Sequence, residues 1–177
     1  MPVVAADGAL GIEARHVWNG LTLNDLTVWP RYRLRRIRGL HDLPDSDDNR
    51  EPKTEQIGEI VYPSYARGKT VTYEGQVIGR TLQELRNGSQ LLRTAFGPDI
   101  STGLNPERRM VIVPHPTYGT QQHTFQGQCR LCTIEDDQTN GPTRLPAPFI
   151  RQFVIDIRLA DPRLYLWDGT TATSARW

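Results

Sequence analysis

The sequence contains few of the residues from which metal sites, disulfide frameworks and catalytic centres are built. Its 177 residues include two cysteines and four histidines. Two cysteines are too few for a disulfide-stabilised scaffold. The histidines form no HExxH cluster, and the chain has no GxSxG nucleophile elbow, no phosphate-binding loop and no dinucleotide-binding fingerprint. We therefore expect no catalytic residues, no metal and no cofactor, and a protein that is not an enzyme.

The two cysteines have the CxxC spacing of a metal knuckle or a redox motif. However, residues 124–134 alternate between apolar and polar side chains as in a strand, which puts Cys129 and Leu131 on one face. Cys132 then points to the opposite face, and the two thiols do not converge. Because no second CxxC pair is present, we expect the cysteines to serve as small apolar side chains rather than as zinc ligands or redox groups.

The sequence also lacks an excess of charge of either sign and a long apolar run. Its 21 basic and 20 acidic residues give a net charge of +1, so no overall field attracts the chain to nucleic acid or to a membrane. No stretch approaches the roughly 18 apolar residues that a bilayer span requires. Residues 1–20 lack a basic segment followed by an apolar one, so we expect no signal peptide. These features predict a protein of a reducing compartment that does not contact a membrane.

Several segments have the patterns that predict β-strands. In the clearest of them, Val71, Tyr73 and Val77 alternate with polar residues. Asn19-Gly20 favours a tight hairpin, and Asp161-Pro162 predicts the turn that ends the last long strand. The main predicted strands span residues 29–38, 69–78, 110–113, 124–134 and 149–159.

One segment, residues 81–96, predicts an amphipathic helix. Thr81 and Glu84 form a capping box, in which the Thr81 hydroxyl accepts from the Glu84 backbone N–H and the Glu84 carboxylate reaches back. Gly97-Pro98 predicts the end of the helix, with Gly97 in a left-handed conformation. The apolar stripe of this helix is formed by Leu82, Leu85, Leu92 and Phe96.

The number and order of these elements predict a mainly β fold. A parallel sheet requires several crossover helices, and only one helix is visible. We therefore expect an antiparallel β-sandwich or split barrel with one flanking α-helix at about residues 81–96. We expect a single domain over residues 1–165, followed by a C-terminal tail or linker at 166–177.

Residues 41–67 have the weakest regular pattern in the chain, and only residues 57–62 resemble a strand. Loops of more than about 12–15 residues without regular structure are usually functional or disordered. We therefore expect a projecting arm or a long surface loop here. Its spacing of acidic residues does not match a calcium-binding loop. These acidic residues include Asp42, Asp45, Asp47 and Asp48.

Five arginines within eight residues form a basic stripe along the predicted strand 29–38. Tyr32 and Leu34 take the opposite face, and a bulge near Arg35-Arg36 returns Ile37 to the core side. We call this set the arginine stripe; it consists of Arg31, Arg33, Arg35, Arg36 and Arg38.

Three interpretations of the arginine stripe remain open. It forms a seam between subunits, in which the acidic loop 42–51 of one copy pairs with the arginines of the next. It is a solvated strand face. Or it binds phosphates of a nucleic acid. The last is the least favoured, because only Trp29 and Tyr32 offer aromatic rings nearby and the net charge is close to zero.

Three segments together resemble the N-terminal domain of siphophage distal tail proteins. The first is Tyr32–Leu40, which reads YRLRRIRGL. The second is Arg67–Phe96, where a glycine-containing strand leads into the leucine-rich helix. The third is Phe153–Tyr165, which reads FVIDIRLADPRLY. The resemblance rests on the order and spacing of these segments and covers roughly Leu23 to Tyr165.

The resemblance implies a tail-tube-like fold with an arm and a structural role in the virion. In this family, six copies form a homohexameric ring that joins the tail tube to the tail tip or baseplate. The implied partners are further copies of the chain, the tail-tube protein, the tail-tip or baseplate hub protein, and the tape-measure protein in the lumen. DNA only passes through, and no membrane is contacted. The implied location is the tail tip of the virion, and the host cytoplasm during assembly.

Two alternatives to a distal tail hub stay open. One is a tail-tube or tail-terminator subunit, which differs in the partner on which it stacks. The other is a carbohydrate- or nucleic-acid-binding β domain, which predicts a monomer with affinity for a ligand. For the ring, the polar face of strand 69–78 is a candidate lining of a wet channel; it carries Thr70, Thr72, Glu74 and Gln76.

Overall fold

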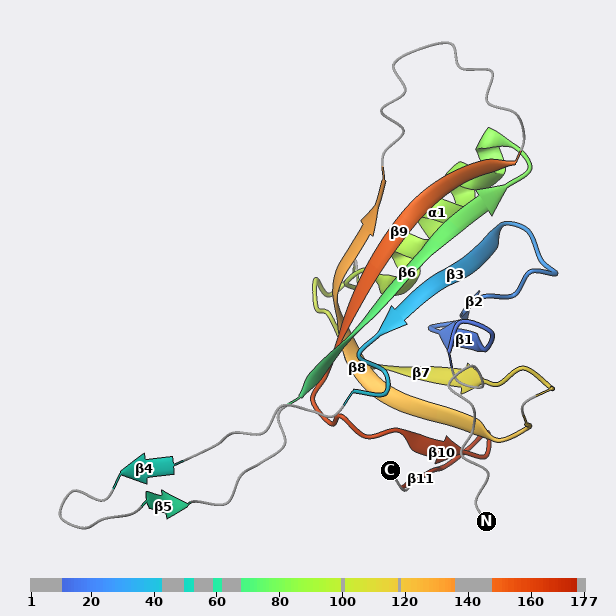
Figure 1. The fold of residues 1–177 in the computed structure, drawn as a ribbon. Coiled ribbons are helices and arrows are strands. Elements are labelled where there is room, and N and C mark those ends of the chain that lie inside the picture. The colour runs from blue at the N-terminus through green and yellow to red at the C-terminus, as the bar shows by residue number, and fades with distance from the viewer. Residues whose placement is uncertain are drawn as a thin grey trace.

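Strands of alternating apolar and polar residues make up most of the fold, as the sequence predicts (Figure 1). The computed structural model describes residues 11–42, 50–52, 59–61, 68–99, 101–117, 119–135 and 148–174. The elements are β1 (Arg15–Trp18), β2 (Leu21–Leu23), β3 (Arg31–Arg38), β4 (Arg50–Pro52), β5 (Glu59–Val61), β6 (Lys69–Gly79), α1 (Leu82–Phe96), β7 (Arg108–Val113), β8 (Gln122–Ile134), β9 (Phe149–Leu159), β10 (Tyr165–Trp167) and β11 (Ala172–Ser174).

One large antiparallel sheet contains every strand except β4 and β5, which confirms the predicted mainly β fold. Its order is β2-β1-β7-β8-β9-β6-β3, and β10 pairs with both β8 and β11. β8 belongs to two halves of this sheet, because it pairs with β7 up to Gly127 and with β9 from Gln128 onward. The sheet does not close into a barrel. The two edge strands, β2 and β3, approach each other, and the Asn24 backbone N–H donates to the Tyr32 carbonyl at 2.6 Å.

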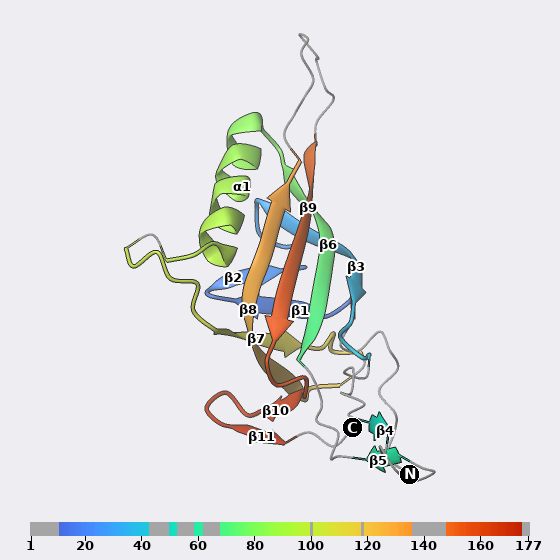
Figure 2. The same ribbon diagram turned by 90° about the vertical axis from the view of Figure 1, so that its left-hand side faces the viewer.

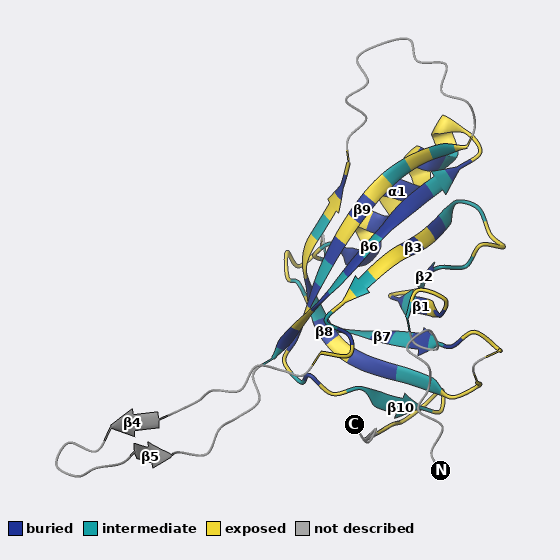
Figure 3. Ribbon diagram, viewed as in Figure 1, coloured by how far each residue is buried: buried dark blue, intermediate teal, exposed yellow. Residues whose placement is uncertain are grey.

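The core lies between the concave side of this sheet and α1 (Figures 2 and 3). The helix packs on β6, β9, β8 and β2. At its C-terminal end, the Trp18 ring stacks on Phe96 with ring centroids 5.4 Å apart, and the indole N–H donates to the Ala95 carbonyl at 3.1 Å. The helix and the β1–β2 hairpin are therefore joined through one aromatic pair.

The long strands follow their predicted patterns. Val71, Tyr73 and Val77 of β6 are fully buried. The alternate residues of β9 face the same core; they are Phe153, Ile155, Ile157 and Leu159. In β3, the register shifts between Leu34 and Arg36, which confirms the bulge predicted near Arg35-Arg36. The Asn19-Gly20 turn is also confirmed, since both residues have positive φ and connect the paired strands β1 and β2.

The helix begins as predicted, with Thr81 as its N-cap. The Glu84 N–H donates to the Thr81 hydroxyl at 3.1 Å, and the Glu84 carboxylate accepts from the Arg80 backbone N–H at 2.8 Å. Two details of the prediction are wrong. Leu82 is not part of the buried stripe: it is the first helical residue and is 45% exposed. Gly97 has φ −74° rather than a left-handed conformation, because a residue before proline favours extended backbone.

The buried helix face contains Leu85, Leu92 and Phe96 of the predicted stripe and three small residues besides. Gly88 lies on it, and a Cβ at this position would come within 2.8 Å of the Pro30 ring. The glycine therefore permits the close approach of the β2–β3 connection to the helix. This face consists of Leu85, Gly88, Ser89, Leu92, Ala95 and Phe96.

Two other segments add to the predicted outline. In residues 166–177, which the sequence analysis assigns to a tail or linker, Leu166 and Trp167 of β10 pair with β8, and β11 completes a hairpin. In the arm at 41–67, β5 lies within the predicted strand 57–62 and pairs with β4. The remainder of the arm, residues 43–49, 53–58 and 62–67, lies outside the described residues.

His16 is a fully buried polar residue at the centre of the core. Its Nε2 lies 3.1 Å from the Gly11 carbonyl, which can only accept, so Nε2 carries the proton. The Tyr73 hydroxyl then donates to Nδ1 at 3.2 Å. Burial lowers the pKa of His16 from 6.5 to about 4, against the opposing effect of the Gly11 carbonyl. His16 is therefore neutral in the folded chain at neutral pH.

Acidification is expected to destabilise the chain through His16. Because the pKa is lower in the folded than in the unfolded chain, the stabilisation is present above about pH 6.5 and is lost as the pH falls toward 4. Between pH 7 and pH 5 the wild type should lose about 2 kcal/mol more free energy of unfolding than His16→Gln. Urea unfolding at both pH values measures this difference. The exposed His115→Gln is the control and should follow the wild type; equal pH dependence of wild type and His16→Gln would refute the assignment.

Removal of the helix cap gives a second stability test. Thr81→Ala leaves the Glu84 N–H without its side-chain acceptor and should lower the free energy of unfolding by about 1 kcal/mol. Thr94→Ala is a matched control within α1, since its hydroxyl only donates to the Gln90 carbonyl. This control should change stability by less than about 0.5 kcal/mol. Equal midpoints for the two variants in thermal unfolding would show that Thr81 does not cap the helix.

Candidate subunit interface

The arginine stripe lies along an end strand of the large sheet. β3 pairs with β6 on one side, and within the described parts of the chain no strand pairs with its other side. Tyr32 and Leu34 are buried toward α1, so the arginines lie on the outer face of the sheet. The prediction that the stripe occupies one face opposite Tyr32 and Leu34 is confirmed.

Most of the stripe has no partner of opposite charge among the described residues. Arg38 pairs with Glu74 of β6 at 2.5 Å, and the Arg31 guanidinium lies 4.0 Å from the centroid of the Trp29 ring. An exposed pair such as Arg38–Glu74 contributes about 0–1 kcal/mol. Arg33, Arg35 and Arg36 are exposed and form no ion pair with any residue that the structure describes. Three guanidinium groups are thus available to a partner.

The outer face of the sheet changes in character from β3 to β8. Next to the arginines, Thr72 donates to the Asp156 carboxylate at 2.7 Å, and Gln76 is buried rather than wet. On β8 and β9 the same face carries three exposed apolar side chains among polar ones: Ile150 is 45%, Val154 36% and Leu131 46% exposed. Of the other polar residues on this side of β6, Thr70 is exposed, whereas Thr72 and Glu74 are half-buried. We call Leu131, Ile150 and Val154 the apolar strip.

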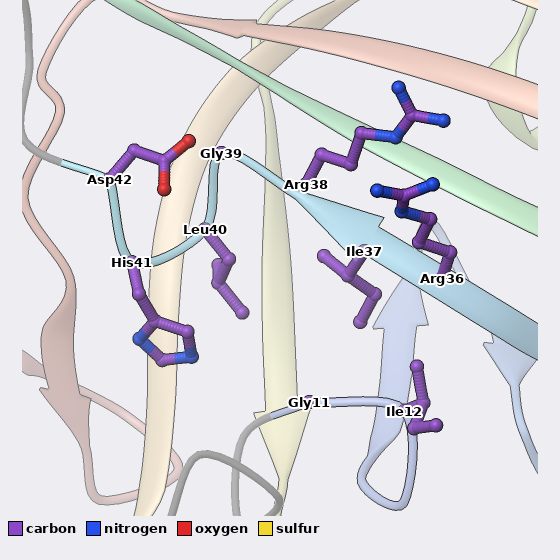
Figure 4. A pocket seen from close by; sticks show the side chains of 9 residues that line it. All are labelled: Gly11, Ile12, Arg36, Ile37, Arg38, Gly39, Leu40, His41 and Asp42. Carbon is purple, nitrogen blue, oxygen red and sulfur yellow. The ribbon is translucent and has the colours of Figure 1, made fainter.

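A groove runs beside the free side of β3. One part has a volume of about 590 Å³ and lies between Gly11-Ile12 and residues 36–42; Figure 4 shows Arg36 and Arg38 extending to one side of β3 and Ile37 to the other. A second part of about 730 Å³ lies between Ile12 and Leu34 and reaches residues 113–117. Ile12 lines both parts, so the two parts adjoin each other. They lie beside β3, where the sheet does not close.

The predicted acidic partner of the stripe is only partly described. Asp42 is exposed at the end of β3, and its carboxylate makes no ion pair with the arginine stripe. Its backbone is fixed, because the buried Lys69 ammonium donates to the carbonyls of Leu40 and Asp42 at 2.8 and 3.3 Å. Burial lowers the pKa of Lys69, and the Asp42 charge opposes this. Asp45, Asp47 and Asp48 lie outside the described residues.

The helix cap and the start of the arginine stripe meet at Trp29, which the sequence analysis did not foresee. The Arg80 guanidinium lies 5.3 Å from the Trp29 ring centroid on one hand and pairs with Glu84 at 2.5 Å on the other. Trp29 is thus contacted by both Arg31 and Arg80. The contact between Arg80 and Trp29 joins residues 51 positions apart, so no local pattern predicted it. The one hint in the sequence was a tryptophan close to Arg31.

The cysteines differ from the predicted arrangement. A register shift between Cys129 and Leu131 turns Leu131 outward, so Cys129 and Cys132 both face the core. The prediction that they lie on opposite faces is therefore wrong, because the bulge adds one residue to the alternation. Burial raises the pKa of Cys129 to about 12 and that of Cys132 to about 11. Both thiols are free and protonated at neutral pH.

Among the described residues, no group of three or more histidine, cysteine, aspartate or glutamate side chains is arranged to hold a metal ion. No helix in the same part of the chain has the length and apolar character needed to cross a membrane.

The raised thiol pKa values predict slow alkylation of the folded chain. At pH 8 the thiolate fraction of a group with a pKa near 11 is roughly hundredfold lower than that of an ordinary cysteine. Iodoacetamide should therefore modify the native chain roughly hundredfold more slowly than the chain in urea. Mass spectrometry over time measures both rates. Rapid modification of either cysteine in the native chain would contradict their burial.

The fold is similar to a solved structure of the SPP1 Dit protein (gp 19.1), described as a paradigm of the hub adsorption apparatus in phages that infect Gram-positive bacteria. The TM-score is 0.58 and the sequence identity 14%; the match covers 87% of this chain and 52% of the SPP1 chain. This chain thus spans about half the length of the protein that it matches. No protein-family model and no curated protein sequence matches it. The resemblance to distal tail proteins is confirmed at the level of the fold.

Proposed function

We propose that the chain is a structural subunit of a bacteriophage tail, in the position of the distal tail hub. Six copies form a ring that joins the tail tube to the tail tip or baseplate, and DNA and the tape-measure protein pass through its centre. The observation that carries this proposal is the similarity of the fold to SPP1 Dit over 87% of the chain. The protein acts without catalysis, within the virion.

The open sheet supports assembly with further copies. β2 and β3 are the edge strands at the two sides of the sheet order, and the unpaired edge of such a strand is a site for association with another chain. In a closed ring of identical copies, neighbours cover both edges of each sheet, and the assembly stops at a fixed number of copies. The apolar strip adds surface that gains free energy when a neighbour or a partner covers it.

The arginine stripe supports a specific contact between neighbours. Arg33, Arg35 and Arg36 have no acidic partner among the described residues, and guanidinium groups bind carboxylates in bidentate geometry. The acidic residues of the arm supply such carboxylates. In the proposed seam, the stripe of one copy pairs with the arm of the next, whose acidic residues are Asp42, Asp45, Asp47 and Asp48.

Charge reversal tests the ring and its seam together. The wild-type chain should have the mass of about six copies by light scattering and show a central hole in negative-stain images. Arg36→Glu should reduce the mass to that of smaller species, because it places like charges across the seam. Asp47→Lys should do the same, and the double variant Arg36→Glu/Asp47→Lys should restore the ring.

The matched control is Arg86→Glu, which makes the same charge change on the exposed side of α1. It should leave the mass unchanged. A wild-type chain with the mass of one copy at every accessible concentration would contradict the proposed ring. A ring that tolerates Arg36→Glu as well as it tolerates Arg86→Glu would contradict the seam but not the ring.

A further inference from the structure

Arg109 of β7 is a half-buried guanidinium without an acceptor. Its central carbon lies 4.3 Å from the ring centroid of Trp167 in β10. Its Nε is buried and has no hydrogen-bond partner, and no residue in the described ranges forms an ion pair with it. Arginine carries five N–H donors, and buried donors in folded proteins are nearly always paired. The stacking on Trp167 holds the plane of the guanidinium and leaves its buried Nε–H without an acceptor.

The same guanidinium lines a cavity of about 170 Å³. Arg109 is paired in register with Gln126 of β8, and Thr124 of β8 is paired with Tyr165 of β10, so the strands that carry these residues form one side of the cavity. The share of liquid volume taken by one water is about 30 Å³, so a small group fits beside Arg109. The lining residues are Arg109, Thr124, Phe125, Gln126, Asp161, Tyr165 and Ala172.

Asp161, the one acidic residue of this lining, is already paired. Its carboxylate accepts from the Arg163 guanidinium at 2.8 Å and from the Tyr165 hydroxyl. The hydrogen bond from Arg163 lowers the pKa of Asp161, so the carboxylate stays ionised and bound to Arg163. Arg163, which does not line the cavity, thus compensates the charge of Asp161 and leaves Arg109 as the one cation of the lining without an acidic partner among the described residues.

We propose that this cavity binds a carboxylate group through Arg109. A carboxylate matches the planar, two-donor geometry of a guanidinium, and Trp167 holds that guanidinium in a fixed orientation. The Gln126 side chain lies on the neighbouring strand, opposite Arg109, and has amide donors of its own. The group belongs either to a free small carboxylate or to an aspartate or glutamate side chain of a partner. This site is distinct from the arginine stripe and does not depend on the proposed ring.

A titration followed by NMR tests the site directly. The reporter is the indole N–H resonance of Trp167, assigned by its loss in Trp167→Phe. Acetate at constant ionic strength should shift this resonance saturably, whereas acetamide, its neutral isostere, should not. The blocked peptides Ac-Gly-Glu-Gly-NH2 and Ac-Gly-Gln-Gly-NH2 repeat the comparison for a side chain. A response to the glutamate peptide as well as to acetate identifies a partner side chain as an occupant; a response to acetate alone restricts the site to small carboxylates.

Two variants attribute the binding to Arg109. Arg109→Gln should weaken acetate binding by about tenfold or more, since it removes a charge-assisted pair. Arg109→Lys keeps the charge but loses the planar fork, and it should bind more weakly than the wild type. Arg31→Gln is the matched control, because Arg31 also stacks on a tryptophan and also has a buried, unpaired Nε.

Three results would overturn the proposal. They are the absence of a saturable shift with either carboxylate probe, an equal shift with the neutral isosteres, and unchanged binding in Arg109→Gln. The first two use the wild-type chain, so they decide the question even if Arg109→Gln does not fold. Equal weakening by Arg31→Gln would likewise count against a site at Arg109.

Discussion

The architecture depends on the passage of one strand, β8, through both halves of the sheet. Its first residues pair with β7 and its last residues with β9, and the change of partner falls at Gly127. A Cβ at this position would lie 2.6 Å from the Ile157 side chain, so only glycine lets β8 cross so close to β9. Because the sheet bends around this crossing, α1 and Trp18 can fill its concave side.

The same bend explains the open side of the molecule. It brings β2 and β3 near each other without pairing them as strands, so that the Asn24–Tyr32 hydrogen bond joins them at one end. The groove beside β3 follows from this incomplete closure, and the exposed arginines lie at its border. The surface most suited to a neighbour is therefore a consequence of how the core is closed. No additional loop or helix is needed to form this surface.

The sequence predicted those features that local chemistry determines. The strand 69–78, the Thr81 cap, the Asn19-Gly20 turn and the bulge near Arg35-Arg36 all follow from spacing within about ten residues. The bulge between Cys129 and Leu131 was missed because the partner strand β9 sets that register. The short strand β10 has too few residues for a periodic pattern, and the Trp167–Arg109 stack joins residues 58 positions apart. The sequence analysis named the residues of the candidate interface, but it did not predict the groove or the apolar strip beside them.

A net charge of +1 conceals two kinds of arginine with different physical roles. Arg33 and Arg36 are exposed. In the proposed seam, each exposed ion pair would add at most about 1 kcal/mol, so such pairs would select the partner and its register more than stabilise the ring. In the proposed ring, most of the association free energy would then come from the apolar strip and from the unpaired edges of the sheet. Arg109 has already lost part of its hydration to the protein. A carboxylate that reaches it therefore gains more than one that reaches the stripe, because the interaction is screened less by water.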